Sequence, residues 1–197
     1  MLFRPLPSEQ VSVVSRPSVR SLAASVFPKW QSRLTTKFLR LISESLSMHG
    51  IRAEDGFRLC SLFPPDSPTT TSVAFAFQTG EVWCTDTDFL RYGQTIPFVE
   101  PVYIERLSDY ARFLRSLGID PPYRWICGMT GVKGYRAQVP VPPGHTRPGQ
   151  GPRCLSETIK MNGTFDGVES AQTALLPFFE EIFHRCGVPR PAHLPRS

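Results

Sequence analysis

Two carboxylates, Asp86 and Asp88, follow an apolar stretch that is typical of a strand. Paired carboxylates at a strand end can hold a divalent cation, because hard oxygen ligands suit Mg²⁺ and Mn²⁺. Nucleotide-sugar transferases use a similar pair, but they carry a long alternating βα array in front of it that this chain lacks. The alternative is a helix cap, in which Asp86 or Thr87 caps a short turn over 86–92. We expect the capping role, and a small metal-dependent enzyme using Asp86 and Asp88 is the alternative hypothesis.

The histidines and cysteines show no spacing that indicates a metal site or a disulfide framework. His145 precedes Cys154 by nine residues and His184 precedes Cys186 by two, but nothing in the sequence marks a thiol as activated. The five cysteines are far apart and mostly flanked by apolar residues: Cys60, Cys84, Cys127, Cys154 and Cys186. We therefore expect reduced, partly buried thiols in a cytoplasmic protein and no cofactor.

A glycine-containing segment, residues 128–134 (GMTGVKG), lies between two stretches that are typical of strands. It is not a Walker A phosphate loop, because no Ser or Thr follows Lys133. Its Gly-x-x-Gly core is similar to the clamp of KH domains, but that clamp joins two helices. The simpler interpretation is a hairpin turn with positive φ at Gly131 or Gly134, after which residues 135–141 return antiparallel.

Aromatic and cationic residues alternate around this turn, and on an exposed face they would stack on bases and contact phosphates. Strand alternation, however, places Trp125 and Arg124 on opposite faces, which weakens a nucleic-acid interpretation. Lys133 escapes this constraint because it lies in the turn. The candidate contact surface for nucleic acid or a partner protein consists of Arg124, Lys133, Tyr135 and Arg136.

The positive charge is concentrated at the N-terminal end. The formal net charge is +5, and residues 1–40 contain seven Lys or Arg and one Glu, whereas residues 41–197 contain 15 basic and 16 acidic residues. A contact with nucleic acid or anionic lipid is therefore indicated only for the first 40 residues, and a solvated basic leader explains the same charge. No apolar run approaches the roughly 18 residues of a membrane helix, so we expect no membrane span.

Apolar periodicity predicts both helices and strands. Helices are expected from Trp30 to a stop at Gly50, over 107–117 with Gly118 behind it, and from Glu169 to Gly187 with a bend at Pro177; Leu114 and Phe179 should be core residues. Strands are expected at 57–63, 72–77, 81–85, 98–105 (interrupted by Pro101), 123–129 and 135–141, with a surface loop at 142–153 and a short helix at 154–161.

This mixture favours an α+β fold: a single domain over 29–188 with a mainly antiparallel sheet and packed helices. A flexible basic segment, 1–28, would precede the domain, and a Pro-rich tail, 189–197, would follow it.

Three stretches from Gly80 onward carry a family resemblance: GEVWCTDTDFLRYGQTIPFVE, LGIDPPYRWICGMTGVKGYRAQVP and LLPFFEEIFHRCGVPRP. They resemble the C-terminal portion of bacterial proteins that carry a Schlafen/AlbA-type DNA-binding domain. In those proteins the AlbA-type domain lies upstream, with a Glu-Phe-Lys-like strand and an Ala-Phe-Ala-Asn helix followed by paired glycines. This chain contains neither, so the resemblance excludes the part that would carry ATP or DNA binding. It implies a detached accessory module or a shortened product. The function that we expect is a non-catalytic interaction module that contacts a partner protein or nucleic acid.

Overall fold

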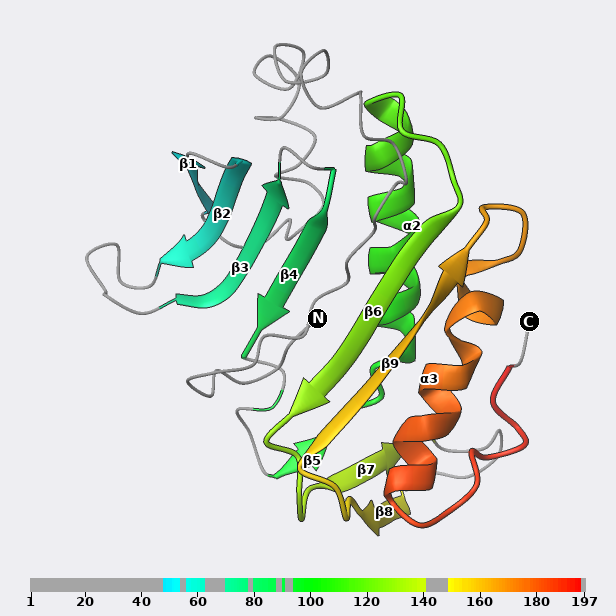
Figure 1. Ribbon diagram of the computed structural model, residues 1–197. Helices are drawn as coiled ribbons and strands as arrows, with labels where there is room; N and C mark the ends of the chain where they lie inside the picture. The colour runs from blue at the N-terminus through cyan, green and yellow to red at the C-terminus, as the bar shows by residue number, and fades with distance from the viewer. Residues whose placement is uncertain are drawn as a thin grey trace.

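Short alternating stretches near the beginning of the described chain pair as a four-stranded antiparallel sheet (Figure 1). The structure is a computed structural model and describes residues 48–53, 56–62, 70–77, 80–87, 90, 94–140 and 149–195. The strands lie in chain order, and their bounds are β1 Met48–Ala53, β2 Gly56–Leu62, β3 Thr70–Phe77 and β4 Val82–Asp86. The strands predicted at 72–77 and 81–85 correspond to β3 and β4, which pair antiparallel, and Gly80 before β4 adopts a φ of 87°.

The helix that the sequence predicts before β1 lies mostly outside the described residues, as does the basic segment 1–28. The predicted stop at Gly50 is wrong. Gly50 lies inside β1, where it pairs with Leu59 of β2. A glycine is a local signal for the end of a helix. Here the pairing of β1 with β2 determines the conformation of Gly50 instead.

The strand that contains the predicted aromatic and cationic residues, β6 (Tyr123–Thr130), pairs antiparallel with β9 (Thr158–Phe165). The predicted hairpin to residues 135–141 is therefore wrong, and so is the short helix at 154–161. Gly131 and Gly134 both have positive φ, 74° and 81°, as the glycine spacing predicts. Here they turn the chain out of the two-stranded ribbon instead of reversing it.

The segment after this turn joins a separate small sheet of order β5-β7-β8. Strand β7 (Arg136–Val139) pairs in parallel with β5 (Thr95–Ile96) and antiparallel with β8 (Gly149–Arg153). Residues 149–153 were predicted to be loop because of their glycines and proline, so this part of the loop prediction is wrong. Pairing with β7 holds this segment in a strand conformation that its local composition does not indicate.

Helix α2 (Glu100–Ser116) begins earlier than the sequence predicts, and the expected extended segment at 98–105 is wrong. Pro101 lies in the first turn of the helix, where its missing N–H is not needed and its fixed φ suits the helix. The predicted end is confirmed. Gly118 has a φ of 79°, and its N–H donates to the Arg115 carbonyl oxygen at 2.9 Å.

Helix α3 (Ala171–Arg185) begins two residues later than predicted. Its N-cap is Ser170, whose hydroxyl accepts a hydrogen bond from the Thr173 N–H at 3.1 Å. Pro177 lies inside the helix, and Gly187 follows its C-cap with a φ of 77°.

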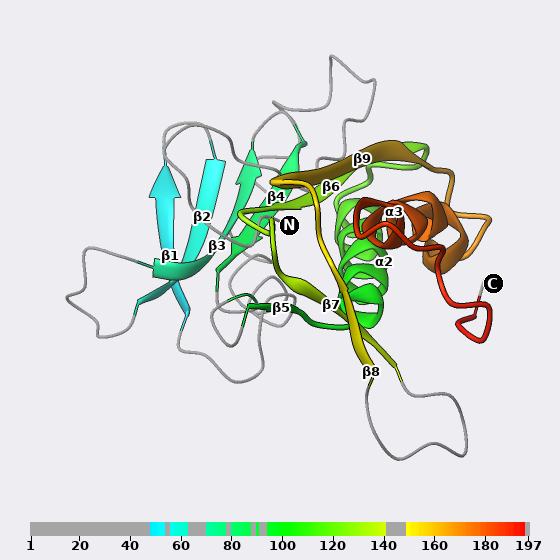
Figure 2. The ribbon, with the colours of Figure 1, turned by 90° about the horizontal axis from the view of Figure 1, so that it is seen from below.

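Both helices lie on one side of the β6–β9 ribbon, as Figure 2 shows, and the core fills the space between them. The ring centroids of Tyr103 on α2 and Phe178 on α3 are 4.9 Å apart. Leu114 and Phe179 are fully buried, which confirms their predicted place in the core. The fold is thus a single α+β domain in which antiparallel pairing dominates and the two described helices cover the ribbon.

The segment that the sequence sets apart as a Pro-rich tail packs against this domain. Arg190 is buried and forms two hydrogen bonds with the carboxylate of Glu100, at 2.8 and 2.7 Å. Leu194 is also buried. The chain beyond α3 is therefore fastened to the beginning of α2.

Candidate interaction site

The structure separates the four residues that the sequence proposes as a contact surface. Arg124 is exposed near the start of β6, six residues before Thr130, so it lies roughly 20 Å along the strand from the turn. Lys133 is exposed in the turn, whereas Tyr135 is partly buried against the core. The Arg136 guanidinium donates to the Gly151 carbonyl oxygen at 3.4 Å. Lys133, Tyr135 and Arg136 therefore share one short segment, and Arg124 stands apart.

The aromatic residues of β6 face the core. Tyr123 and Trp125 are 1% and 2% exposed, and the Tyr123 hydroxyl donates to the Ile119 carbonyl oxygen at 2.8 Å. Rings enclosed in this way cannot stack on bases. The alternation that places Trp125 opposite to Arg124 is thus confirmed.

The outward side of the β6–β9 ribbon carries polar side chains without a carboxylate. Arg124 lies opposite Thr164, and Lys160 lies opposite Gly128. We call the exposed residues on this side the ribbon face: Arg124, Thr158, Lys160, Asn162 and Thr164. Its two cations and several hydrogen-bond donors are the groups that contact a phosphate backbone.

The carboxylate of Asp86 accepts a hydrogen bond from the Ser72 hydroxyl at 2.8 Å. Asp88 and most of the turn that Asp86 or Thr87 would cap lie outside the described residues. Within the described part of the chain, no group of three His, Cys, Asp or Glu side chains is arranged to hold a metal ion.

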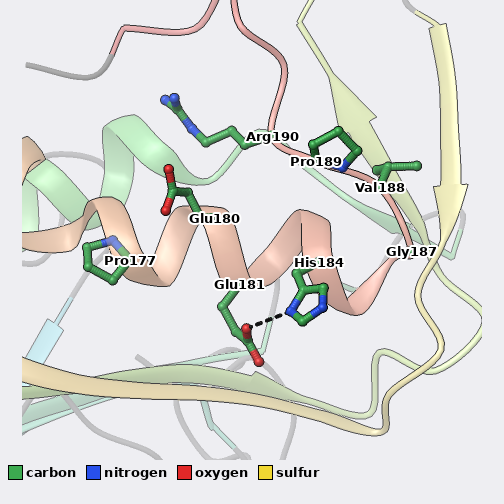
Figure 3. Close-up of a pocket in the computed structure, with 8 residues that line it drawn as sticks. All are labelled: Pro177, Glu180, Glu181, His184, Gly187, Val188, Pro189 and Arg190. Carbon is green, nitrogen blue, oxygen red and sulfur yellow. Dashed lines mark hydrogen bonds and ion pairs between the residues drawn. The ribbon is translucent and has the colours of Figure 1, made fainter.

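A concave surface that the sequence analysis did not foresee lies along the exposed side of α3 (Figure 3). One wall is the helix, where Pro177, Glu181 and His184 recur at helical spacing, and the other wall is the chain after the helix. The volume is about 800 Å³. We call it the α3 groove, and its lining residues are Pro177, Glu180, Glu181, His184, Gly187, Val188, Pro189 and Arg190.

The α3 groove combines carboxylates with apolar rings. Glu181 pairs with His184 and Arg185, which lie three and four residues further along the helix. Burial acts to raise the pKa of Glu181, but hydrogen bonds from Arg185 and His184 outweigh it, so the pKa lies below the ordinary value. Glu180 is exposed, and no hydrogen bond or ion pair of its carboxylate occurs among the described residues.

The single arginine of the groove does not offset these charges. Arg190 is 8% exposed, and its guanidinium is taken up by Glu100 and by the carbonyl oxygens of Leu194 and Pro195. The open surface of the groove is therefore acidic and is bordered by Pro177, Val188 and Pro189. The only sequence signals are a Pro inside a predicted helix and a Pro-rich end, which are individually typical of a bend and a tail.

No model of a protein family, no curated protein and no solved structure matches this chain. Among the described residues, none of the helices has the length and apolar composition to cross a membrane. The function must therefore be argued from the side chains themselves.

Proposed function

We propose that this protein is a non-catalytic interaction module that binds a partner protein through the α3 groove. The observation that carries the proposal is the combination of a concavity of about 800 Å³ with an exposed carboxylate, Glu180, on its rim. This volume is within the range of about 300–1,000 Å³ that is typical of ligand sites. The resemblance to accessory regions of Schlafen/AlbA-type proteins supports the same role.

The chemistry of the groove selects a cationic segment of the partner. A Lys or Arg side chain can lay its aliphatic stem against Pro177 while its charge meets Glu180, and Val188 and Pro189 offer apolar contacts at the other end of the groove. A phosphate group would face carboxylates at the same place, so nucleic acid is disfavoured there. The contact with Glu180 is solvent-exposed and should weaken as salt is added.

Photo-crosslinking from the groove identifies the partner. A benzophenone amino acid is placed at Glu180 in one sample and at Glu105, an exposed acid of α2, in the other. Both proteins are irradiated in an extract of the source cells. A polypeptide that crosslinks from position 180 and not from position 105 is expected.

The affinity of the purified partner then tests the charge argument. We expect Glu180→Lys to weaken binding about tenfold or more, whereas Glu105→Lys makes the same charge change away from the groove and should alter it less than about twofold. Equal losses in the two variants, or identical crosslinks from both positions, would contradict binding in the α3 groove.

The ribbon face supports a second candidate function, binding to a nucleic-acid backbone. The specific observation is that its charged groups, Arg124 and Lys160, are both cationic and exposed. Two phosphate contacts would give a slope of about −1.8 for the logarithm of the binding constant against the logarithm of salt with duplex DNA. Arg124→Glu and Lys160→Glu should then abolish binding of the full chain to labelled oligonucleotides.

Lys133 tests the other part of the contact surface in the same assay. It is exposed beside the ribbon, so Lys133→Glu should weaken oligonucleotide binding if the turn also contacts phosphate. If the affinity for oligonucleotides is unchanged in all three charge-reversal variants, only the first 40 residues remain as a basic contact. If the full chain binds neither DNA nor RNA, binding to a partner protein remains as the one proposed function.

A further inference from the structure

Two cysteines that are far apart in the sequence lie side by side in the fold. Cys154 begins the connection between β8 and β9, and Cys186 is the C-cap of α3. The backbone holds them together, because the N–H of Leu155 donates to the carbonyl oxygen of Arg185 at 2.9 Å. Their thiols are in hydrogen-bond contact, and both residues are buried, at 1% and 4% exposure.

The surroundings of Cys154 favour its thiolate. A hydrogen bond from the Cys186 thiol, a backbone hydrogen bond with Ser156 and the charge of Arg185 lower the pKa of Cys154 to about 7, although burial acts to raise it. In the protonated state the Cys154 thiol lies 3.3 Å from the Ser156 carbonyl oxygen and donates to it, which partly opposes ionisation. The Cys154 thiol therefore ionises more readily than an ordinary cysteine.

The second thiol keeps its proton. The pKa of Cys186 is raised because its proton is held by Cys154, because the site is buried and because a second negative charge would lie beside the first. The two thiols thus differ: the pKa of Cys154 is lowered, and Cys186 keeps the proton that it donates to Cys154.

Another buried cysteine lacks this arrangement. Cys127 is fully buried in β6, and burial raises the pKa of its thiol far above the ordinary value. A buried thiol without a stabilising donor is unreactive. Burial alone therefore does not produce the ionisation of Cys154, and Cys127 is an internal control.

We propose that Cys154 and Cys186 form an oxidisable dithiol site, in which Cys154 is the nucleophile toward hydrogen peroxide and Cys186 is the thiol that resolves the product into a disulfide. The proposal rests on the contact between the two thiols and is independent of what binds in the α3 groove.

The oxidation proceeds in two balanced steps. The Cys154 thiolate attacks one oxygen of hydrogen peroxide, the O–O bond breaks, and sulfur becomes a sulfenic acid while the second oxygen takes up a proton and leaves as water. The Cys186 sulfur then attacks the Cys154 sulfur, an S–S bond forms, the S–O bond breaks, and the hydroxyl leaves as water with the Cys186 proton. Two thiols lose two electrons, and the peroxide is reduced to two waters.

The buried pair lies next to exposed residues through which peroxide would have to enter. Residues 154–157 form a short connection without regular structure, and the Leu155 side chain within it is 70% exposed. Gly187, next to Cys186, is also exposed. The proposal requires that this connection shift to admit peroxide and that the two sulfurs approach to the roughly 2.05 Å of a disulfide.

Trypsin gives a direct test on the full chain. Cleavage after Arg153 and after Arg185 places the two thiols in separate peptides, residues 154–160 and 186–196. The reduced protein is treated with increasing concentrations of hydrogen peroxide, and free thiols are alkylated. The tryptic peptides are then analysed by mass spectrometry without reduction. We expect the two peptides to appear joined, with a mass two hydrogens below their sum, while Cys127 remains alkylatable in the unfolded protein.

Two variants separate a dithiol site from general oxidation. Cys186→Ala should remove the joined peptide and leave Cys154 as sulfinic or sulfonic acid, whereas Cys127→Ala should leave the joined peptide unchanged. Recovery of both peptides as unmodified thiols, at a peroxide dose that oxidises free cysteine in the same tube, overturns the proposal. So does a disulfide of Cys154 with any other cysteine or with a second chain.

The pH profile of alkylation tests the ionisation separately. Iodoacetamide should label Cys154 with a midpoint near pH 7 in the folded protein. In Cys186→Ala the midpoint should rise toward the ordinary value of about 8.5, so labelling at pH 7 falls severalfold to about tenfold. An unchanged midpoint would show that Cys186 does not activate Cys154.

Discussion

At the scale of single residues, the backbone of Gly163 lies close against the indole of Trp125. They lie opposite each other in the β6–β9 register, and a Cβ on Gly163 would approach the Trp125 Cζ2 atom to 2.5 Å. The indole is buried and cannot move out of the way. The absence of a side chain at position 163 is therefore what allows Trp125 to lie flat against β9.

We predict that Gly163→Ala lowers the free energy of unfolding by about 1–3 kcal/mol, because the added methyl group overpacks the core. Urea denaturation followed by Trp fluorescence measures this loss. Thr164→Ala changes the next residue of the same strand, which is exposed, and should stay within about 0.5 kcal/mol of the wild type. A similar loss in both variants would show that strand propensity, and not the contact with Trp125, decides the result.

Single residues also show where prediction from the sequence ends. Alternation along β6 correctly separates Trp125 from Arg124, because the two-residue period of a strand is a local property. The activation of Cys154 is different. Its donor, Cys186, is 32 residues away in the sequence, and no spacing rule connects them, so the ionised thiol becomes visible only in the fold.

At the scale of elements, α2 and α3 form the apolar layer beneath the ribbon. Leu114 and Phe179 are each 0% exposed, and they come from different helices that both face the core. Their positions follow from the helical period of the sequence, which predicts the buried side of a helix well even where its first turn is misjudged.

We predict that Leu114→Ala costs about 2–5 kcal/mol and Phe179→Ala about 3–5 kcal/mol in the free energy of unfolding, through lost burial and the cavity that remains. Chemical denaturation of the purified variants measures both. Val168→Ala removes methyl groups from a side chain that is 90% exposed and should be nearly neutral. Losses below about 0.5 kcal/mol at position 114 or 179 would contradict their place in the core.

At the scale of elements, the sequence predicts β6 and β7 correctly from their residue periodicity but predicts the wrong pairing for them. The sequence identifies β6 and the following segment as strands, but it pairs them with each other because they are adjacent in the chain. Strand β6 pairs instead with β9, which begins beyond the β7–β8 pair. Local composition also hides β8, whose Gly149–Arg153 run contains two glycines and a proline and becomes a strand only through β7.

At the scale of the whole molecule, the chain after α3 is held to the start of α2 by a buried ion pair. Glu100 and Arg190 are 90 residues apart, and their side chains are 5% and 3% exposed. The pair has two parallel hydrogen bonds, and Arg190 also donates to the carbonyl oxygens of Leu194 and Pro195. The same arginine places Val188 and Pro189 along α3, so the wall of the α3 groove depends on it.

We predict that Arg190→Ala lowers the free energy of unfolding by about 3–5 kcal/mol, because it leaves the Glu100 carboxylate buried without a partner. Glu100→Gln should also destabilise the protein, because it leaves the Arg190 guanidinium buried without a counter-charge, although the carbonyl oxygens of Leu194 and Pro195 still accept its hydrogen bonds. The double variant Glu100→Leu with Arg190→Met removes both charges and should recover most of the loss, giving a coupling energy that a double-mutant cycle measures.

If the single and double variants lose stability additively, the two side chains act separately. The C-terminal segment and the groove wall would then be held by the burial of Leu194 and not by the ion pair.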